Sequence, residues 1–244
     1  MIEIPNKLWE NKKQLTLNTK RVYLMSKIEL VIFDMDGLML DTEKLSYDSW
    51  KKAASNYGYL LTKEIFLKLL GTNALKIKQT LIETFGKDFP FDNVYEERMK
   101  IGNEYADKYG VQTKEGLIEL LTFLTDSGIK KAVATSTNRD RATMLMSRAG
   151  IFIFFDNAVY GDEVKRSKPD PEIFLKAAEK FSLKSESCVV LEDSPAGIKA
   201  AYSAGMIPIM IPDMVSPDEE TRNMAFKVLK SLHEVKELFI SEFI

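Results

Sequence analysis

The chain has 244 residues, of which 45% are hydrophobic, and this length fits one core domain with a smaller accessory domain. Its 34 basic residues nearly balance its 36 acidic residues, so no excess of charge indicates binding to nucleic acid or to a membrane surface. No apolar stretch of the sequence approaches the length of a membrane span. The single cysteine, Cys188, excludes an internal disulfide, which is typical of a cytoplasmic protein, and its apolar neighbours predict a buried structural thiol.

The first part of the chain predicts an extension, a strand and a helical block, in that order. Residues 1–26 contain no continuous apolar segment, and we expect a loosely attached N-terminal extension there. The run 28–33 is short, apolar and β-branched, which predicts a buried strand. From residue 42 to about 109 the pattern becomes helical, and glycines that stop helices indicate about four helices and no strand. These glycines are Gly58, Gly71, Gly86 and Gly110.

After the helical block, strands and helices alternate. The pattern predicts strands at 129–134, 157–160, 187–191 and 206–211, and helices at 116–127, 140–149, 171–181 and 196–204. Strands separated by helix-length segments indicate a parallel sheet covered on both faces. We therefore expect an α/β fold whose core comprises residues 27–40 and 114–244, with the helical block 41–113 inserted as a cap. Ligands of such sheets bind beyond the carboxyl ends of the strands.

The first predicted strand ends in two carboxylates, Asp34 and Asp36, followed by Gly37. In an extended chain, side chains two residues apart point to the same side, and two crowded carboxylates repel each other unless a cation or a shared proton relieves them. Mg²⁺ would relieve this repulsion and could bridge to a phosphate oxygen. The alternative interpretation is a capped surface turn of the Asp-x-Asp-Gly type, which the preceding apolar strand disfavours.

Three further polar sites follow in the alternating part of the chain. Thr135 and Ser136 end a strand and could bind a phosphate, although they could equally cap the next helix. Lys168 stands on a proline-rich backbone before a helix and could point at an anion, although most lysines are simply solvated. Glu192 and Asp193 end another strand and could bind a metal or cap the following helix. Together these groups favour a metal–phosphate site.

These motifs, in this order, resemble those of the haloacid dehalogenase superfamily. The matching segments span residues 27 to 213: Asp34-Met35-Asp36-Gly37-Leu38-Met39-Leu40-Asp41-Thr42-Glu43, Thr135, Lys168-Pro169-Asp170-Pro171 and Glu192-Asp193-Ser194-Pro195-Ala196-Gly197. The resemblance implies a Rossmann-like core with a helical cap inserted after the first motif. It also implies an enzyme that acts on a small phosphate ester. With the balanced charge and the single cysteine, we expect a soluble cytoplasmic protein without nucleic acid or membrane partners, as a monomer or weak dimer.

The resemblance further implies a role for each motif residue. Asp34 would attack phosphorus and form an aspartyl phosphate, while Asp36 would act as general acid and then as base. Mg²⁺ would be bound by Asp34, Asp193 and the main-chain carbonyl of Asp36, with Glu192 as a further ligand or a partner of the ligands. The transferring phosphoryl group would be held by Thr135, Lys168 and the backbone near Ser136. A carboxylate nucleophile and side chains that hold the phosphate in position are both typical of enzymes that transfer phosphoryl groups.

Within the family, the sequence is similar to the branch of β-phosphoglucomutase and pseudouridine-5′-phosphatase. The mutase has a histidine in the helix after its first motif, and Ser46 stands at the corresponding position here. This difference favours simple hydrolysis, with a sugar phosphomutase as the alternative and a catalytically silent binding protein as a third hypothesis. We expect a sugar or nucleoside phosphate as substrate, contacted in the cap by Thr72, Asn73 and Lys76.

Overall fold

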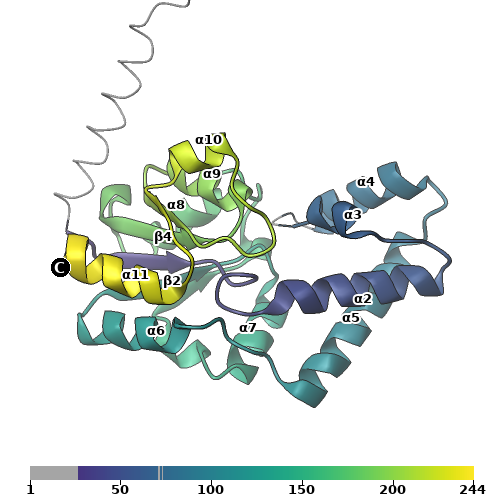
Figure 1. Cartoon of the computed structure of the whole chain (residues 1–244), viewed down its shortest axis with the longest axis horizontal. Helices are drawn as coiled ribbons and strands as arrows, with labels where there is room; N and C mark the ends of the chain where they lie inside the picture. The colour runs from purple at the N-terminus through teal and green to yellow at the C-terminus, as the bar shows by residue number, and fades with distance from the viewer. Residues whose placement is uncertain (1–26, 71, 73) are drawn as a thin grey trace, which may run out of the picture.

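The computed structural model describes residues 27–70, 72 and 74–244. The N-terminal extension predicted for residues 1–26 lies outside the described residues. Figure 1 shows a sheet covered by helices and, beside it, a smaller lobe made only of helices. Within the described ranges, no helix is long and apolar enough to span a membrane. The part of the chain that the structure describes consists of a larger α/β lobe and a smaller helical lobe, which meet along one edge of the sheet.

The sheet of the described chain has six strands, all parallel, in the order β3-β2-β1-β4-β5-β6. The first strand lies at the centre, and Leu30 is aligned with Lys130 of β2 and with Cys188 of β4. This parallel sheet, covered by helices, confirms the predicted α/β fold class. The strands are β1 (Leu30–Phe33), β2 (Lys130–Ala134), β3 (Asn157–Val159), β4 (Cys188–Glu192), β5 (Ile207–Met210) and β6 (Lys227–Val228).

Helices cover both faces of the sheet because the central strand is apolar on both sides. Val31 and Phe33 belong to one hydrophobic core, and Leu30 and Ile32 belong to the other. The first core is completed by α6 (Leu117–Asp126), α7 (Arg139–Arg148) and α11 (Leu232–Leu238), and the second by α8 (Glu172–Glu179) and α9 (Pro195–Ser203). Figure 1 shows α6 and α11 on the side of the sheet opposite α8 and α9.

The helical lobe agrees with the periodicity of the sequence, because its described part contains four helices and no strand. These are α2 (Thr42–Asn56), α3 (Lys63–Leu67), α4 (Ala74–Phe85) and α5 (Phe91–Tyr109). The lobe has a hydrophobic core of its own, in which Trp50, Phe66 and Leu81 are fully buried. We propose the predicted limits, 41–113, as the bounds of this cap.

The two chain segments that join the cap to the core run side by side. The Asp41 amide donates to the Gln112 carbonyl at 3.0 Å, and the Lys114 amide donates to the Met39 carbonyl at 2.8 Å. The Lys114 ammonium also binds the carboxylates of Asp41, at 3.1 Å, and Asp213, at 2.8 Å. These contacts fix where the cap leaves the sheet edge, immediately after the first strand.

The sequence pattern predicts no element after residue 211, but the fold continues there. A short helix, α10 (Glu219–Met224), packs against α9, and β6 adds two residues beside β5. The chain ends in α11 and a π-helical turn, η4 (Phe239–Phe243). Since two paired residues show no alternation of apolar and polar positions, β6 cannot be recognised from periodicity. The 3₁₀ turns are η1 (Phe152–Phe154), η2 (Gly161–Glu163) and η3 (Ser185–Ser187).

Candidate active site

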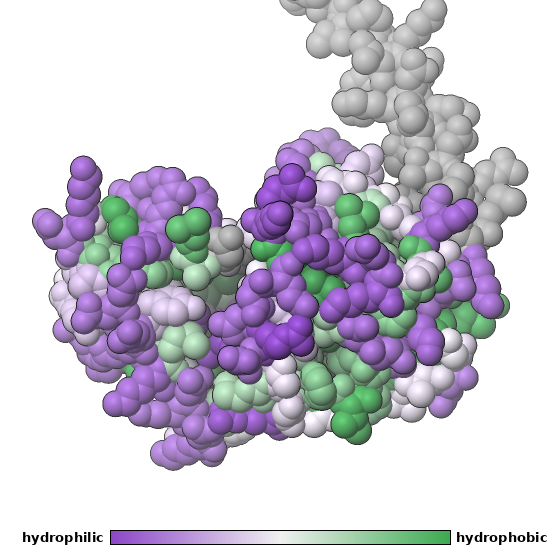
Figure 2. All heavy atoms as spheres, turned by 180° about the vertical axis from the view of Figure 1, so that it is seen from behind, coloured by the Kyte–Doolittle hydropathy of each residue, from purple (hydrophilic) through white to green (hydrophobic). Residues whose placement is uncertain are grey.

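The predicted polar residues converge at the carboxyl ends of the central strands. Asp34 follows β1, Thr135 follows β2, and Asp193 follows β4, so three neighbouring strands deliver these side chains to one edge. A cavity of about 430 Å³ lies at this edge, beneath the cap, and Figure 2 shows the surface hollowed between the two lobes. All the predicted catalytic and metal-binding residues line the cavity: Asp34, Asp36, Thr135, Ser136, Lys168 and Asp193, together with Glu192.

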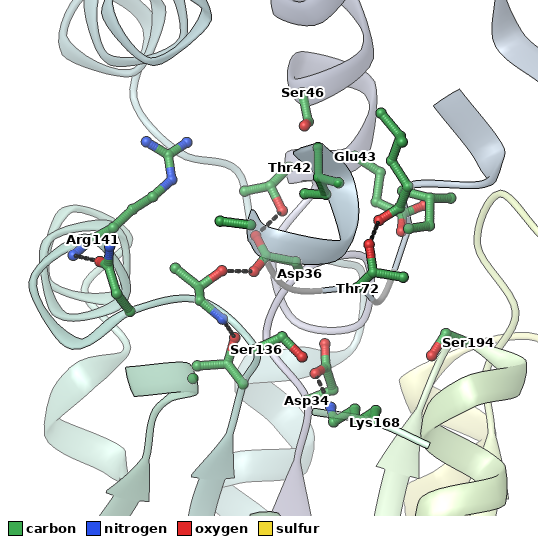
Figure 3. A pocket seen from close by; sticks show the side chains of 18 of the residues that line it. Asp34, Asp36, Thr42, Glu43, Ser46, Thr72, Ser136, Arg141, Lys168 and Ser194 are labelled. Atoms are coloured by element: carbon green, nitrogen blue, oxygen red, sulfur yellow. Dashed lines mark hydrogen bonds and ion pairs between the residues drawn. The ribbon is translucent and has the colours of Figure 1, made fainter. Parts of the chain in front are cut away.

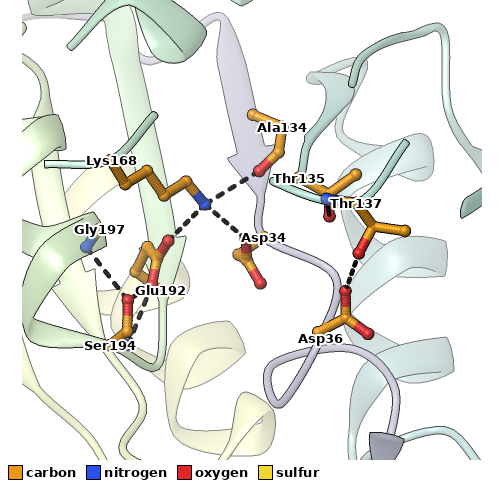
Figure 4. Close-up of polar contacts among 9 residues, drawn as sticks. All are labelled: Asp34, Asp36, Ala134, Thr135, Thr137, Lys168, Glu192, Ser194 and Gly197. Carbon is orange, nitrogen blue, oxygen red and sulfur yellow. Dashed lines mark hydrogen bonds and ion pairs between the residues drawn. The ribbon is translucent and has the colours of Figure 1, made fainter. Parts of the chain in front are cut away.

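Lys168 is the centre of a buried charge network. Its ammonium donates to Asp34 Oδ1 at 2.5 Å, to Glu192 Oε1 at 2.6 Å and to the Ala134 carbonyl at 3.1 Å (Figure 4). Burial alone would lower the pKa of Lys168, but the charges of Asp34 and Glu192 outweigh burial and raise this pKa above its ordinary value. The lysine therefore carries a fixed positive charge beside Asp34, pointing inward rather than into solvent.

Both carboxylate oxygens of Glu192 have protein partners. Oε1 accepts from Lys168, while Oε2 accepts from the Ser194 amide at 3.0 Å and from its hydroxyl at 2.9 Å. Helix α9 passes so close that a Cβ on Gly197 would lie 1.9 Å from the Glu192 carboxylate. Glu192 thus holds the lysine, and Gly197 provides the space that this arrangement needs.

Asp36 is held away from Asp34 by two hydroxyl groups. Strand β1 ends at Phe33, immediately before Asp34, and Asp36 forms an isolated bridge with Leu40. Asp36 Oδ1 accepts from the Thr42 hydroxyl and Oδ2 from the Thr137 hydroxyl, both at 2.7 Å. Thr42 belongs to the first sequence motif and Thr137 follows Thr135 by two residues, but nothing in their spacing indicates that they meet at Asp36.

The loop after β2 is shaped by a glycine that the sequence interpretation missed. The Gly161 amide donates to the Thr137 carbonyl at 3.0 Å, and a Cβ on Gly161 would lie only 2.0 Å from the Ser136 carbonyl oxygen. Within the loop, the Thr137 amide donates to the Thr135 hydroxyl at 3.0 Å. Gly161 therefore lets the 135–137 turn lie tightly against the chain that follows β3.

An acidic cluster lies beside the network. Burial, the largest effect, raises the pKa of Asp34 to about 7 even though Lys168 lowers it. Burial and the Glu192 charge raise the pKa of Asp193, and burial and Asp213 raise that of Glu43 to about 8. Oxygen-rich, crowded carboxylates of this kind favour a bound divalent cation, which would offset their repulsion.

The space beside this cluster is suited to a small hard cation. Gly37 has a φ of +84°, and a Cβ there would lie 2.5 Å from Asp193 Oδ2, so the turn approaches the carboxylate as only glycine can. In the described part of the chain, no group of three or more His, Cys, Asp or Glu side chains forms a metal centre by itself. The predicted magnesium set, Asp34 and Asp193 with the carbonyl of Asp36, requires only two side chains and stays a prediction.

The cap closes the other side of the cavity with a mixture of apolar and polar groups. Thr72, one of the predicted substrate contacts, lines the cavity, as does Ser46. Asn73 lies outside the described residues. Lys76 is not among the lining residues, and its ammonium lies 3.4 Å from Gln79 Oε1 on the exposed side of α4. The cap residues that sequence reasoning missed include Trp50, Phe66, Leu69, Tyr95 and Arg98.

Comparison with known proteins agrees with the motifs. A family model described as haloacid dehalogenase-like hydrolase matches residues 31–211. The "Phosphorylated carbohydrates phosphatase" of Thermotoga maritima is 36% identical and covers 73% of this chain and 82% of its own length. The "Probable pseudouridine-5′-phosphatase" of Drosophila melanogaster is 32% identical over 87% of this chain and 94% of its own. The crystal structure of β-phosphoglucomutase from Clostridium difficile matches with a TM-score of 0.75 at 25% identity, over 88% of this chain and 96% of that chain. The chain therefore belongs to the haloacid dehalogenase-like hydrolases, the family that its four motifs predict.

Proposed function

We propose that the protein is a magnesium-dependent phosphatase that hydrolyses a small phosphorylated metabolite, such as a sugar or nucleoside phosphate, through an aspartyl phosphate on Asp34. One observation carries the proposal: the Asp34 carboxylate faces the cavity with Oδ1 held by Lys168, while Oδ2 accepts no hydrogen bond from the described residues. A carboxylate fixed through one oxygen presents the other as a nucleophile. The similarity to named phosphatases supports the same reaction class.

The first half-reaction transfers the phosphoryl group to the enzyme. Asp34 Oδ2 forms a bond to phosphorus as the bond between phosphorus and the ester oxygen breaks. Asp36 gives a proton to the departing oxygen, and the hydroxyls of Thr42 and Thr137 hold its carboxyl group in place for this task. The alcohol part of the substrate then leaves through the opening between cap and core.

The second half-reaction returns the enzyme to its starting state. Asp36, now ionised, takes a proton from a water molecule as that water attacks phosphorus. The bond between phosphorus and Asp34 breaks, inorganic phosphate leaves, and Asp36 is again protonated. The same carboxyl group therefore serves as acid and base in turn, which requires its position to be fixed throughout.

Charge neutralisation at the phosphoryl group comes from both sides of the cavity. Thr135, the main chain near Ser136 and the ammonium of Lys168 would hold the phosphoryl oxygens. Asp34, Asp193 and the Asp36 carbonyl would bind Mg²⁺, which neutralises negative charge on the phosphate. Glu192 keeps Lys168 in position, because both of its oxygens are already bonded within the protein.

A sugar phosphomutase is the alternative function, favoured by the fold shared with β-phosphoglucomutase. At the position corresponding to the mutase histidine, Ser46 lines the cavity, and its hydroxyl is not an acid–base group near neutral pH. Hydrolysis is therefore the better supported reaction. Incubation with a hexose 1-phosphate separates the two, because a mutase would form the 6-phosphate without releasing inorganic phosphate.

Release of inorganic phosphate from a panel of sugar, nucleoside and short-chain phosphate esters tests the proposal. Turnover should require Mg²⁺, stop on addition of EDTA and disappear in Asp34→Asn. Asp48→Asn is a matched control, since Asp48 is an exposed residue of α2 that does not line the cavity. Activity that survives in Asp34→Asn would refute the proposed nucleophile.

A further inference from the structure

Two arginines face the cavity without a carboxylate partner. Arg98 belongs to α5 of the cap and Arg141 to α7 of the core, and both line the cavity. Among the described residues, no Asp or Glu forms an ion pair with either one, and Arg98 Nε is fully buried without a hydrogen-bond acceptor. A buried guanidinium nitrogen without an acceptor is costly, so Arg98 in particular calls for an acceptor that the described residues do not provide.

Arg98 is enclosed by aromatic rings. Its guanidinium carbon lies 5.1 Å from the centroid of Trp50 and 5.3 Å from that of Tyr95. Burial and the positive charge of Arg141 lower the pKa of Arg98 to about 10, while the charge of Asp36 acts in the opposite direction. The side chain remains a cation at neutral pH, and its apolar surroundings strengthen its attraction for an anion.

Arg141 lies against the same part of α5. Its Nη1 donates to Asn103 Oδ1 at 3.0 Å, and its Nη2 would lie 3.8 Å from a Cβ on Gly102. Gly102 is four residues after Arg98, which places the two on the same face of the helix. Figure 3 shows Arg141 on the far side of Asp36 from Lys168. The two guanidinium groups thus form a cationic pair at the end of the cavity away from the nucleophile.

We propose that Arg98 and Arg141 bind a second anionic group at the non-reacting end of the substrate, so that the preferred substrate is a phosphate ester carrying a further carboxylate or phosphate. This inference rests on the proposed function, because it assumes that the reacting phosphate occupies the Asp34 end. Guanidinium groups bind planar or tetrahedral oxyanions through two parallel hydrogen bonds, which suits either group. The apolar side chains that line the cavity would cover the carbon skeleton of the substrate.

Matched pairs of esters test the proposal and separate the two kinds of anion. Sorbitol 6-phosphate and 6-phosphogluconate differ by a carboxylate, whereas fructose 1-phosphate and fructose 1,6-bisphosphate differ by a phosphate. In the wild-type protein, the more charged member of at least one pair should have the higher kcat/KM. Arg98→Met and Arg141→Met should each reduce that preference about tenfold or more, mainly through KM, because a charged hydrogen bond is lost in both ground and transition states.

Arg148→Met is the matched control. Arg148 also belongs to α7 and forms an ion pair with Asp107 of α5, but it does not line the cavity. It should keep the wild-type ratio between the members of each pair. If Arg141→Met and Arg148→Met change the ratio equally, the arginines only join cap and core, and the proposal is wrong.

Two outcomes distinguish failure of this inference from failure of the proposed function. Equal kcat/KM values within both pairs in the wild type, with phosphate still released, would overturn the second anionic site alone. Absence of turnover with every ester, including 4-nitrophenyl phosphate, would overturn the phosphatase. In that case calorimetric binding of the same pairs to the Asp34→Asn protein still tests the arginines, because binding needs no chemistry. Should Arg98→Met fail to fold, Arg141→Met gives the answer, since Arg141 belongs to α7 of the core rather than lying against the aromatic rings of the cap.

Discussion

Replacing Gly197 by alanine should destabilise the protein, although a change from glycine to alanine inside a helix usually stabilises a protein. The new Cβ would lie 1.9 Å from both Cδ and Oε1 of Glu192. Atoms in contact normally lie about 3.5–4.0 Å apart, so the Glu192 carboxylate would have to move by roughly 1.6 Å or more. Such a shift breaks its contact with Lys168 at 2.6 Å and those with Ser194 at 2.9 and 3.0 Å.

The cost follows from the burial of the charges that separate. Lys168 is 4% exposed and Glu192 is 1% exposed, so neither can recover its lost partner from water. Separating one partner of a buried ion pair costs about 3–5 kcal/mol. In a chain of this length, that loss corresponds to a Tm lower by about 6–20 °C. The gain of about 0.5–1 kcal/mol from replacing a helical glycine by alanine does not offset it.

Thermal unfolding followed by circular dichroism measures this difference, with Gly102→Ala as the control. Gly102 is also inside a helix, but a Cβ there would meet its nearest atom, Ser49 Oγ, at 3.5 Å, an ordinary contact. Gly102→Ala should therefore be as stable as the wild type or slightly more stable. A Gly197→Ala protein with an unchanged Tm would show that Glu192 is not held against α9 as described.

Three further predictions concern the phosphate loop, the cysteine and acid stability. Gly161→Ala should lower kcat/KM about a hundredfold in a phosphate-release assay, because the new Cβ would displace the Ser136 carbonyl oxygen, 2.0 Å away, and so misplace the 135–137 turn. An unchanged kcat/KM would contradict this role of Gly161. Burial raises the pKa of the Cys188 thiol to about 12. A thiol reagent at pH 8 should therefore modify Cys188 only after the protein is unfolded in guanidinium, and rapid labelling of the native protein would refute the burial of this thiol. A main-chain hydrogen bond from Lys165, an ion pair with Lys176 and a main-chain hydrogen bond from Arg166 lower the pKa of Glu172 from 4.5 to about 2. The stabilising effect of Glu172 is therefore complete above about pH 4.5 and is lost as the pH falls toward 2. The difference in urea midpoint between the wild type and Glu172→Gln should shrink over that range, and a constant difference would count against the lowered pKa.

The sequence predicts the sheet edge well because strand ends are a local property. Asp34, Thr135 and Asp193 each follow an apolar run, and in a parallel sheet the carboxyl ends of neighbouring strands meet at one edge. Their convergence therefore requires only that the runs be strands of one sheet. Glycines and apolar periodicity likewise predict the helical character of the cap.

What the sequence does not predict are contacts between distant segments. Thr137 reaches Asp36 across 101 residues, and Arg141 meets Asn103 only because the cap folds over the core. No local pattern indicates such pairs, since a threonine after a strand is as typical of a helix cap. The role of Gly197 cannot be predicted from the sequence either, because it depends on how close the Glu192 carboxylate lies to the helix.

The most direct test of the central claim is detection of the covalent intermediate. Protein mixed with a turned-over phosphate ester and Mg²⁺, quenched in acid within milliseconds and digested, should yield one phosphorylated peptide by mass spectrometry, with the phosphoryl group on Asp34. The Asp34→Asn protein, treated identically, should yield none. A label on another residue, or its absence during demonstrated steady-state turnover under conditions that preserve acyl phosphates, would contradict the role of Asp34 as nucleophile.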